Sequence, residues 1–341
     1  MDTITHGLSG TLIGYAARDK FKKIPPKLLV YFFTFSTIFP DFDILFRLVS
    51  EQSYLNNHRG ITHSLVLLPL WGILLSLFFI VVLKYKILLK KHTEEIPTIN
   101  KKTFIELYII STIGIILHII ADLITTYGTM ILSPLDNQKF AYGSIFIIDL
   151  IFSGIIISGI LLSKFYRKYS QSPKIAQIFT VILIAYVGTT QALKINALEK
   201  AKLNFDLEYN EEYYSFTTLP QPLSPFKWKV YAYHSSAEVF YSTTLNLLDK
   251  TETPSWDYVS KWGNNIDWQP LAKMAWKDDN FAQIRHFFAL PVFHSIQENE
   301  GSVCLFFQDL RFSNKYVSNP FVYGLCSHAS GLKTIQKLTK L

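Results

Sequence analysis

The chain has 341 residues, of which 49% are hydrophobic and only 17% are charged, and its formal net charge is +7. This is long enough for two domains and too apolar for an ordinary soluble enzyme. Residues 1–194 carry 19 Lys and Arg against 11 Asp and Glu, whereas residues 195–341 carry 14 against 15. The positive excess therefore lies in the apolar half of the chain. This distribution argues for loop charges that orient membrane helices and against a nucleic-acid partner.

Apolar stretches in the first 195 residues predict an α-helical polytopic membrane domain of five or six helices. In chain order they are residues 7–17, 28–48, 65–83, 104–124, 145–163 and 176–193. Residues 65–83 form a run of 19 without a charge, which meets the length criterion for a spanning helix. The first stretch is short, and Pro40, Asp41 and Asp43 interrupt the second.

Basic loops alternate with basic-poor loops along this domain. Residues 18–27, 84–102 and 164–174 hold 15 of the 19 basic residues, whereas residues 49–64 and 125–144 hold one each. By the positive-inside rule the three basic loops are cytoplasmic. We therefore expect a multi-pass protein of the cytoplasmic membrane whose C-terminal part is extracytoplasmic.

The composition changes after Leu193. Residues 226–248, 303–307 and 321–325 are rich in aromatic and β-branched residues typical of short strands. We expect a membrane domain at residues 1–195 and a mostly β (α+β) aqueous domain at residues 200–341. The cysteines, Cys304 and Cys326, form one disulfide if this part lies outside the cytoplasm, or are two ordinary thiols.

Four short polar signatures stand beside or inside the apolar stretches, at residues 5–6, 41–43, 58–63 and 118–122. The predicted topology brings all four to the outer face of the membrane. Ionisable residues at membrane depth are costly and seldom kept without a function, and His and carboxylate groups bind divalent metals. The candidate ligands are His6, Asp41, Asp43, His58, His63, His118 and Asp122.

The spacing within two signatures favours ligation. His118 and Asp122 are four residues apart, so a helix presents both on one face. Pro40 disfavours a helical conformation just before Asp41 and Asp43, and a bent backbone there could aim both inward. A pair of solvated acids at a loop end is the alternative.

The signature at residues 58–63 reads H-R-G-I-T-H and is the most specific. Gly60 permits a tight turn, and Thr62 is expected to cap a helix that starts near His63. Arg59 suits a phosphate or carboxylate group. The alternative is a His-rich loop without a ligand role.

Asp149 lies inside an apolar run. It is a metal ligand, a carboxylate that orients a histidine, or a hydrogen-bonding residue that packs helices together. The second interpretation is favoured.

These motifs resemble the membrane-bound metal-dependent hydrolase family, a group of bacterial inner-membrane proteins of largely unknown substrate. The likeness rests on M-D-x-x-T-H, D-x-D, H-R-G-x-T-H-S, H-x-x-x-D-x-x-T-x-Y-G-T and F-I-I-D, and it spans most of the chain. The family is distantly similar to zinc-dependent phospholipase C and P1-type nucleases, which hold zinc ions with His and Asp ligands on helices. One departure is Leu150, where the family often has Pro.

The expected function is a metal-dependent hydrolase, with Zn²⁺ as the metal, acting on a phosphoester or lipid-linked substrate at the outer face of the membrane. The metal would activate a water, Asp43 or Asp122 would accept its proton, and Arg59 would steady the anionic substrate. The expected partners are the lipid bilayer and a lipid or phosphorylated small molecule. The alternative is a non-enzymatic metal-binding membrane protein, either a transporter or a scaffold.

Overall fold

The computed structural model describes residues 1–85, 99–166, 171–206, 213–249, 254–299, 301–313 and 319–338. The chain divides into two compact units, one of Met1–Val49 with Asn57–Gln191 and the other of Ser50–Asn56 with Ala192–Leu341. The boundary between them falls inside the continuous helix α7, Ser172–Asp206. The short helix α3, Glu51–Asn57, lies almost entirely in the second unit.

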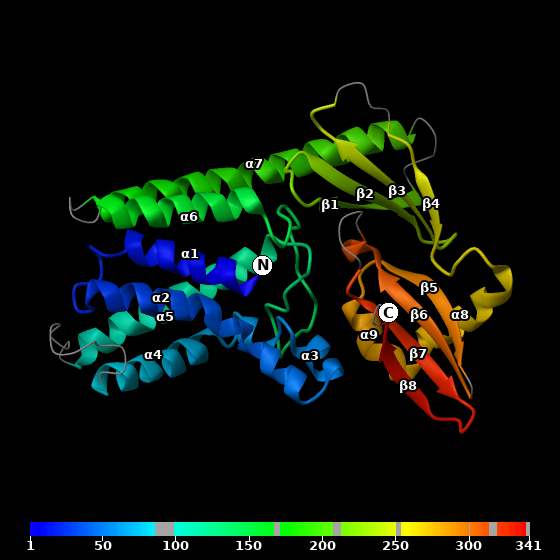
Figure 1. The fold of residues 1–341 in the computed structure, drawn as a ribbon, viewed down its shortest axis with the longest axis horizontal. Coiled ribbons are helices and arrows are strands. Elements are labelled where there is room, and N and C mark those ends of the chain that lie inside the picture. The colour runs from blue at the N-terminus through cyan, green and yellow to red at the C-terminus, as the bar shows by residue number, and fades with distance from the viewer. Residues whose placement is uncertain are drawn as a thin grey trace. The chain divides into compact units, whose positions relative to one another are not determined.

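The first unit is helical. Its elements are α1 (Thr3–Ala16), α2 (Pro26–Ile38), the 3-10 segments Phe39–Leu48 and Ile61–His63, α4 (Leu68–Lys84), α5 (Lys101–Leu123), α6 (Leu150–Phe165) and the first half of α7. The helices lie lengthwise beside one another and alternate in direction (Figure 1). The ends that flank the three basic loops therefore gather at one end of this unit, and the polar signatures gather at the other (Figure 1).

Several of these helices can cross a membrane. Three segments are long and apolar enough, namely Pro26–Leu48, Lys101–Leu123 and Ser172–Phe205, and the bent pair Glu51–His63 with Leu68–Lys84 would make a fourth. The expected five or six spans thus become three or four within the described ranges, because α1 and α6 have 14 and 16 residues, fewer than the roughly 20 that a bilayer requires. The basic residues at 86–98 and 167–170, on which much of the predicted orientation rests, lie outside the described residues.

Helix ends follow capping groups. The Asp149 carboxylate accepts from the Phe152 amide at 2.8 Å, so α6 begins at Leu150, five residues after the apolar stretch begins. Asn100 caps α5 in the same way through Thr103 at 3.1 Å. These side chains satisfy amide groups that the first helical turn leaves without partners.

Glycines allow three helices to approach closely. A Cβ on Gly10 of α1 would lie 2.6 Å from the Phe33 carbonyl oxygen of α2, and a Cβ on Gly114 of α5 would collide with Ser36 of α2. Small residues permit such approach between membrane helices. This packing brings the polar ends of α1, α2 and α5 together.

The second unit contains two four-stranded antiparallel sheets, with strand orders β1-β2-β3-β4 and β5-β6-β7-β8. The strands are β1 (Tyr214–Pro220), β2 (Lys227–His234), β3 (Val239–Asn246), β4 (Asp257–Ser260), β5 (Pro291–Asn299), β6 (Ser302–Asp309), β7 (Val322–His328) and β8 (Lys333–Lys337), and the helices α8 (Gln269–Lys277) and α9 (Ala282–Phe287) lie between β4 and β5 in sequence. The second half of α7 packs Ala197 and Ala201 against Trp228 of β2. The prediction of a mostly β C-terminal part is confirmed.

Cys304 of β6 and Cys326 of β7 face each other in register and form a disulfide. Replacing both with Ser is expected to lower the free energy of unfolding of the second unit by about 3 kcal/mol, because the bond closes a loop with a sequence separation of 22. Denaturant titration followed by tryptophan fluorescence measures this, since five of the six tryptophans lie in this unit. Wild-type protein in reducing agent should lose the same amount, and equal stability of both forms would contradict the prediction.

Candidate metal centre

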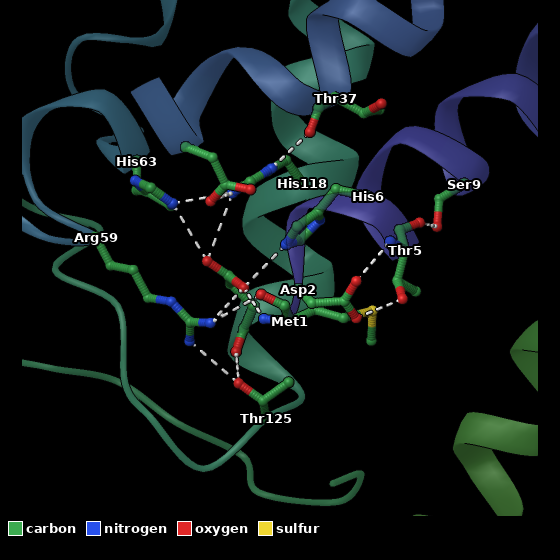
Figure 2. Close-up of polar contacts among 12 residues, drawn as sticks. Met1, Asp2, Thr5, His6, Ser9, Thr37, Arg59, His63, His118 and Thr125 are labelled. Atoms are coloured by element: carbon green, nitrogen blue, oxygen red, sulfur yellow. Dashed lines mark hydrogen bonds and ion pairs between the residues drawn. The ribbon is translucent and has the colours of Figure 1, made fainter. Parts of the chain in front are cut away.

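Side chains from four sequence-distant segments meet at one end of the first unit. His6 comes from α1, Asp41 from the 3-10 segment after α2, His63 from the segment Ile61–His63, and His118 with Asp122 from the last turns of α5. The labelled imidazoles of His6, His63 and His118 point toward one another (Figure 2). All of these residues except Asp41 are fully buried.

Two overlapping groups of three ligand atoms result. In the first, Nε2 of His63 and Nε2 of His118 are 2.9 Å apart and lie 3.2 and 3.5 Å from Asp122 Oδ2. In the second, His118 Nε2 lies 3.6 Å from Asp41 Oδ1, and the His6 ring stacks on the His118 ring with centroids 3.6 Å apart. In each group the candidate ligand atoms lie within 4.8 Å of one another. His118 belongs to both.

The tautomer of His118 follows from the partner of its Nδ1. Its Nδ1 lies 2.6 Å from the carbonyl oxygen of Thr37, and a carbonyl can only accept, so Nδ1 carries the hydrogen. In the neutral ring Nε2 then presents its lone pair toward His63 and Asp122. A hydrogen bond of this kind at the far nitrogen is how proteins fix a metal-binding histidine.

Asp122 Oδ2 is buried without a hydrogen bond in the described part of the chain, although two imidazole nitrogens lie within 3.5 Å of it. When both imidazole nitrogens present lone pairs, as in metal-bound histidines, they and the carboxylate repel one another at such distances unless a cation lies among them. His and carboxylate groups are among the ligands that bind Zn²⁺ in proteins. The residues present therefore fit a divalent metal.

The other oxygen of Asp122 faces positive charge. Arg59 Nη2 lies 2.8 Å from Oδ1, the amine of Met1 contacts the same oxygen, and His6 Nε2 lies 3.2 Å away. Arg59 also donates to the hydroxyl of Thr125 at 3.1 Å (Figure 2). Asp122 thus contacts the guanidinium and His6 through Oδ1, and His63 and His118 through Oδ2.

The turn before His63 has an unusual backbone. Arg59, and not Gly60, occupies the left-handed region with φ 58°. Its amide donates to Asp43 Oδ2 at 2.8 Å and its carbonyl accepts from the Met130 amide at 2.8 Å, which hold this conformation. A Cβ on Gly60 would lie 2.9 Å from the Asn57 carbonyl oxygen, so glycine is required there for close approach.

Asp43 and His58 lie outside both groups of three. Both carboxylate oxygens of Asp43 are 3.1 Å from His58 Nδ1, and Oδ2 is 3.7 Å from Nδ1 of His63. Asp43 therefore sits behind His63, on the side away from Asp122. Carboxylates in that position orient histidine ligands.

Two sequence interpretations are wrong. Thr62 does not cap a helix, because α4 begins only at Leu68 and the Thr62 hydroxyl lies 3.0 Å from Nδ1 of His63. Asp149 orients no histidine among the described residues. Its carboxylate caps α6 and accepts from the Tyr186 hydroxyl at 2.9 Å, which is the helix-packing role that was one of its three alternatives.

Two groups at this site carry no signal in the sequence, and a third belongs to a motif already quoted. The amine of Met1 and the carbonyl of Thr37 are backbone groups, which no side-chain motif marks. Thr125 follows Asp122 by three residues, and its hydroxyl donates to the Asp122 carbonyl at 2.8 Å. Thr125 is the threonine of the motif H-x-x-x-D-x-x-T-x-Y-G-T, and the structure adds its contact with Arg59 at 3.1 Å.

Apolar helices with buried His and Asp side chains at one end define a multi-pass membrane protein with a candidate metal site. The family model described as YdjM inner membrane protein matches residues 1–196, so the chain belongs to this family of inner membrane proteins. The matched residues include all seven candidate ligands. The family description names a location and no reaction.

One curated relative is similar over part of its length. The uncharacterized protein YfhP of Bacillus subtilis (strain 168) is 26% identical over 150 residues, which cover 42% of this chain and 41% of that protein. The match thus spans about two fifths of the relative. No solved structure matches the chain.

Proposed function

We propose that this protein is a membrane-embedded metal-dependent hydrolase that uses zinc and acts on a phosphoester or lipid-linked substrate. The observation that carries the proposal is the convergence of His63 Nε2, His118 Nε2 and Asp122 Oδ2, with the His118 tautomer fixed by Thr37. Three protein ligands leave a fourth position for water, which is the arrangement of catalytic zinc sites.

When bound, the metal lowers the pKa of a coordinated water and polarises the scissile group. Arg59 binds the anionic part of the substrate, because its Nε is buried without a hydrogen-bond partner among the described residues. Asp41 accepts the proton of the water, since its Oδ2 is likewise without a partner and its side chain is 13% exposed. Asp43 positions His58 and His63, because its oxygens already contact both.

We also propose that the active site and the second unit face the extracytoplasmic side. Disulfides persist in oxidising compartments and are rare in the cytosol, and the second unit contains one. The described helix ends next to the basic loops lie at one end of the first unit, and the N-terminus of α1 and the C-termini of α2 and α5, which supply candidate ligands, lie at the other (Figure 1). Both observations support the orientation that the positive-inside rule predicts.

A metal-binding scaffold is the second candidate function. It is favoured by the complete burial of His6, His63, His118 and Asp122, since structural metal sites are closed to water. It predicts metal binding without turnover, whereas the hydrolase predicts both.

The test measures metal content and turnover on the same purified full-length protein. Wild type is expected to bind zinc and to hydrolyse phosphoesters only with zinc present. His63→Ala and Asp122→Asn should each lower the zinc affinity and the rate of hydrolysis by roughly 100-fold or more. His328→Ala, in the second unit, is the matched control and should change neither. Stoichiometric metal in both ligand variants would refute the ligand set, and metal without turnover in the wild type would favour the scaffold.

A further inference from the structure

An apolar cavity of about 280 Å³ lies in the first unit, between α1, α5, α6 and α7. Ten of its twelve lining residues are hydrophobic. The two polar ones are Ser9 and Thr180, and their hydroxyls donate within their own helices, to the carbonyls of Thr5 at 2.9 Å and Ala176 at 2.8 Å. The cavity wall therefore offers a ligand apolar contact rather than hydrogen bonds.

The cavity opens to the outside of the helices. Two of its lining residues, Ile120 of α5 and Ile184 of α7, are 50% and 68% exposed. Both lie in candidate membrane spans, Lys101–Leu123 and Ser172–Phe205. Where these spans cross a bilayer, the opening faces its acyl chains.

The same helical turns carry the cavity wall and the metal ligands. On α5, Leu117 and Ala121 of the wall directly precede His118 and Asp122. On α1, Ser9 follows His6 by three residues, and Figure 2 shows it on the same helix, beside Thr5. A three-residue step is about 5 Å along a helix, so the cavity begins within one turn of the candidate metal centre.

We propose that this cavity binds one acyl chain of a phosphate-bearing membrane lipid whose phosphate reaches Arg59 and the metal. The inference rests on the proposed function and narrows its substrate class from phosphoesters in general to lipids. The two ends of such a molecule match the two surfaces, because the guanidinium and a divalent cation attract the anionic head, whereas the cavity accepts the apolar chain. A soluble phosphoester would leave the cavity unused.

Binding is tested without turnover. Full-length protein in phosphatidylcholine vesicles receives phosphatidate with a photoreactive diazirine on one acyl chain, and the labelled residues are mapped by mass spectrometry. Labels are expected on the cavity wall, and unlabelled phosphatidate should compete while added phosphatidylcholine should not. Labels spread evenly over the exposed helix faces, or equal competition by both lipids, would overturn the proposal, since the cavity would then hold only bulk lipid.

A variant pair tests the chain pocket. Leu183→Trp fills the cavity from α7, at a distance from every metal ligand in sequence, and Val181→Trp on the same helix is outside the lining and 64% exposed. The ratio of kcat/KM for dioleoyl phosphatidate to that for glycerol 3-phosphate should fall on the order of tenfold in Leu183→Trp and stay constant in Val181→Trp. Photolabelling of the cavity wall should also fall in Leu183→Trp.

The outcomes separate the two proposals. An unchanged ratio in Leu183→Trp, with zinc-dependent turnover intact, would overturn the acyl-chain site and leave the hydrolase standing. Competed labelling of the cavity wall without turnover of either compound would overturn the hydrolase and keep the lipid site.

Discussion

Protein in which His118 is replaced by Ala is expected to retain no zinc after purification, and its zinc affinity should be more than 100-fold weaker than that of the wild type. The physical reason is that His118 belongs to both groups of candidate ligands and is the histidine whose tautomer the Thr37 carbonyl fixes. Elemental analysis of detergent-purified protein gives the stoichiometry, and titration with a zinc-sensitive dye gives the affinity. Size-exclusion elution and helix content report whether the variant is folded.

His58→Ala is the matched comparison for this prediction. His58 contacts Asp43 and lies outside both groups of three, so its loss should weaken zinc binding by about tenfold or less and leave the stoichiometry unchanged. His6→Ala removes only the second group and should retain the zinc held by His63, His118 and Asp122. A folded His118→Ala protein with full zinc content would rule out this centre.

The elements could be predicted wherever composition alone decides them. The apolar stretch at residues 104–124 agrees with α5, Lys101–Leu123, because a long run of hydrophobic residues is stable as a helix in a membrane whatever its neighbours are. The end of α7 could not be found in the same way. It continues past residue 193 to Asp206, where small residues such as Ala197 and Ala201 pack against the second unit's own sheet, and that contact has no hydropathy signal.

The sequence predicts which residue types form the candidate site and that they lie at the same end of the helices. It does not predict that Asp41 and Asp43 face different partners. They lie on a 3-10 segment, where a step of two residues turns the chain by about 240° rather than the 200° of an α-helix, and Asp41 faces His118 while Asp43 faces His58. Which acid contacts the metal thus depends on a local helix type that Pro40 suggests but does not determine.

Removing the Arg59 side chain is expected to destabilise the zinc-free protein by about 3–5 kcal/mol, because it takes the guanidinium from a fully buried Asp122. At a zinc concentration of 100 times the wild-type Kd, zinc stabilises the wild type by roughly 2.7 kcal/mol. It should stabilise Arg59→Ala by more at the same concentration, because the cation replaces the lost positive charge and no longer faces the guanidinium. Thermal unfolding in detergent, with chelator and with zinc, measures both quantities.

Two further variants serve as controls. The double variant Arg59→Ala with Asp122→Asn should be less destabilised than Arg59→Ala alone. Arg47 is an exposed arginine of the first unit, and Arg47→Ala should change the stability little. An equal zinc response in the wild type and in Arg59→Ala would show that Asp122 does not contact the metal.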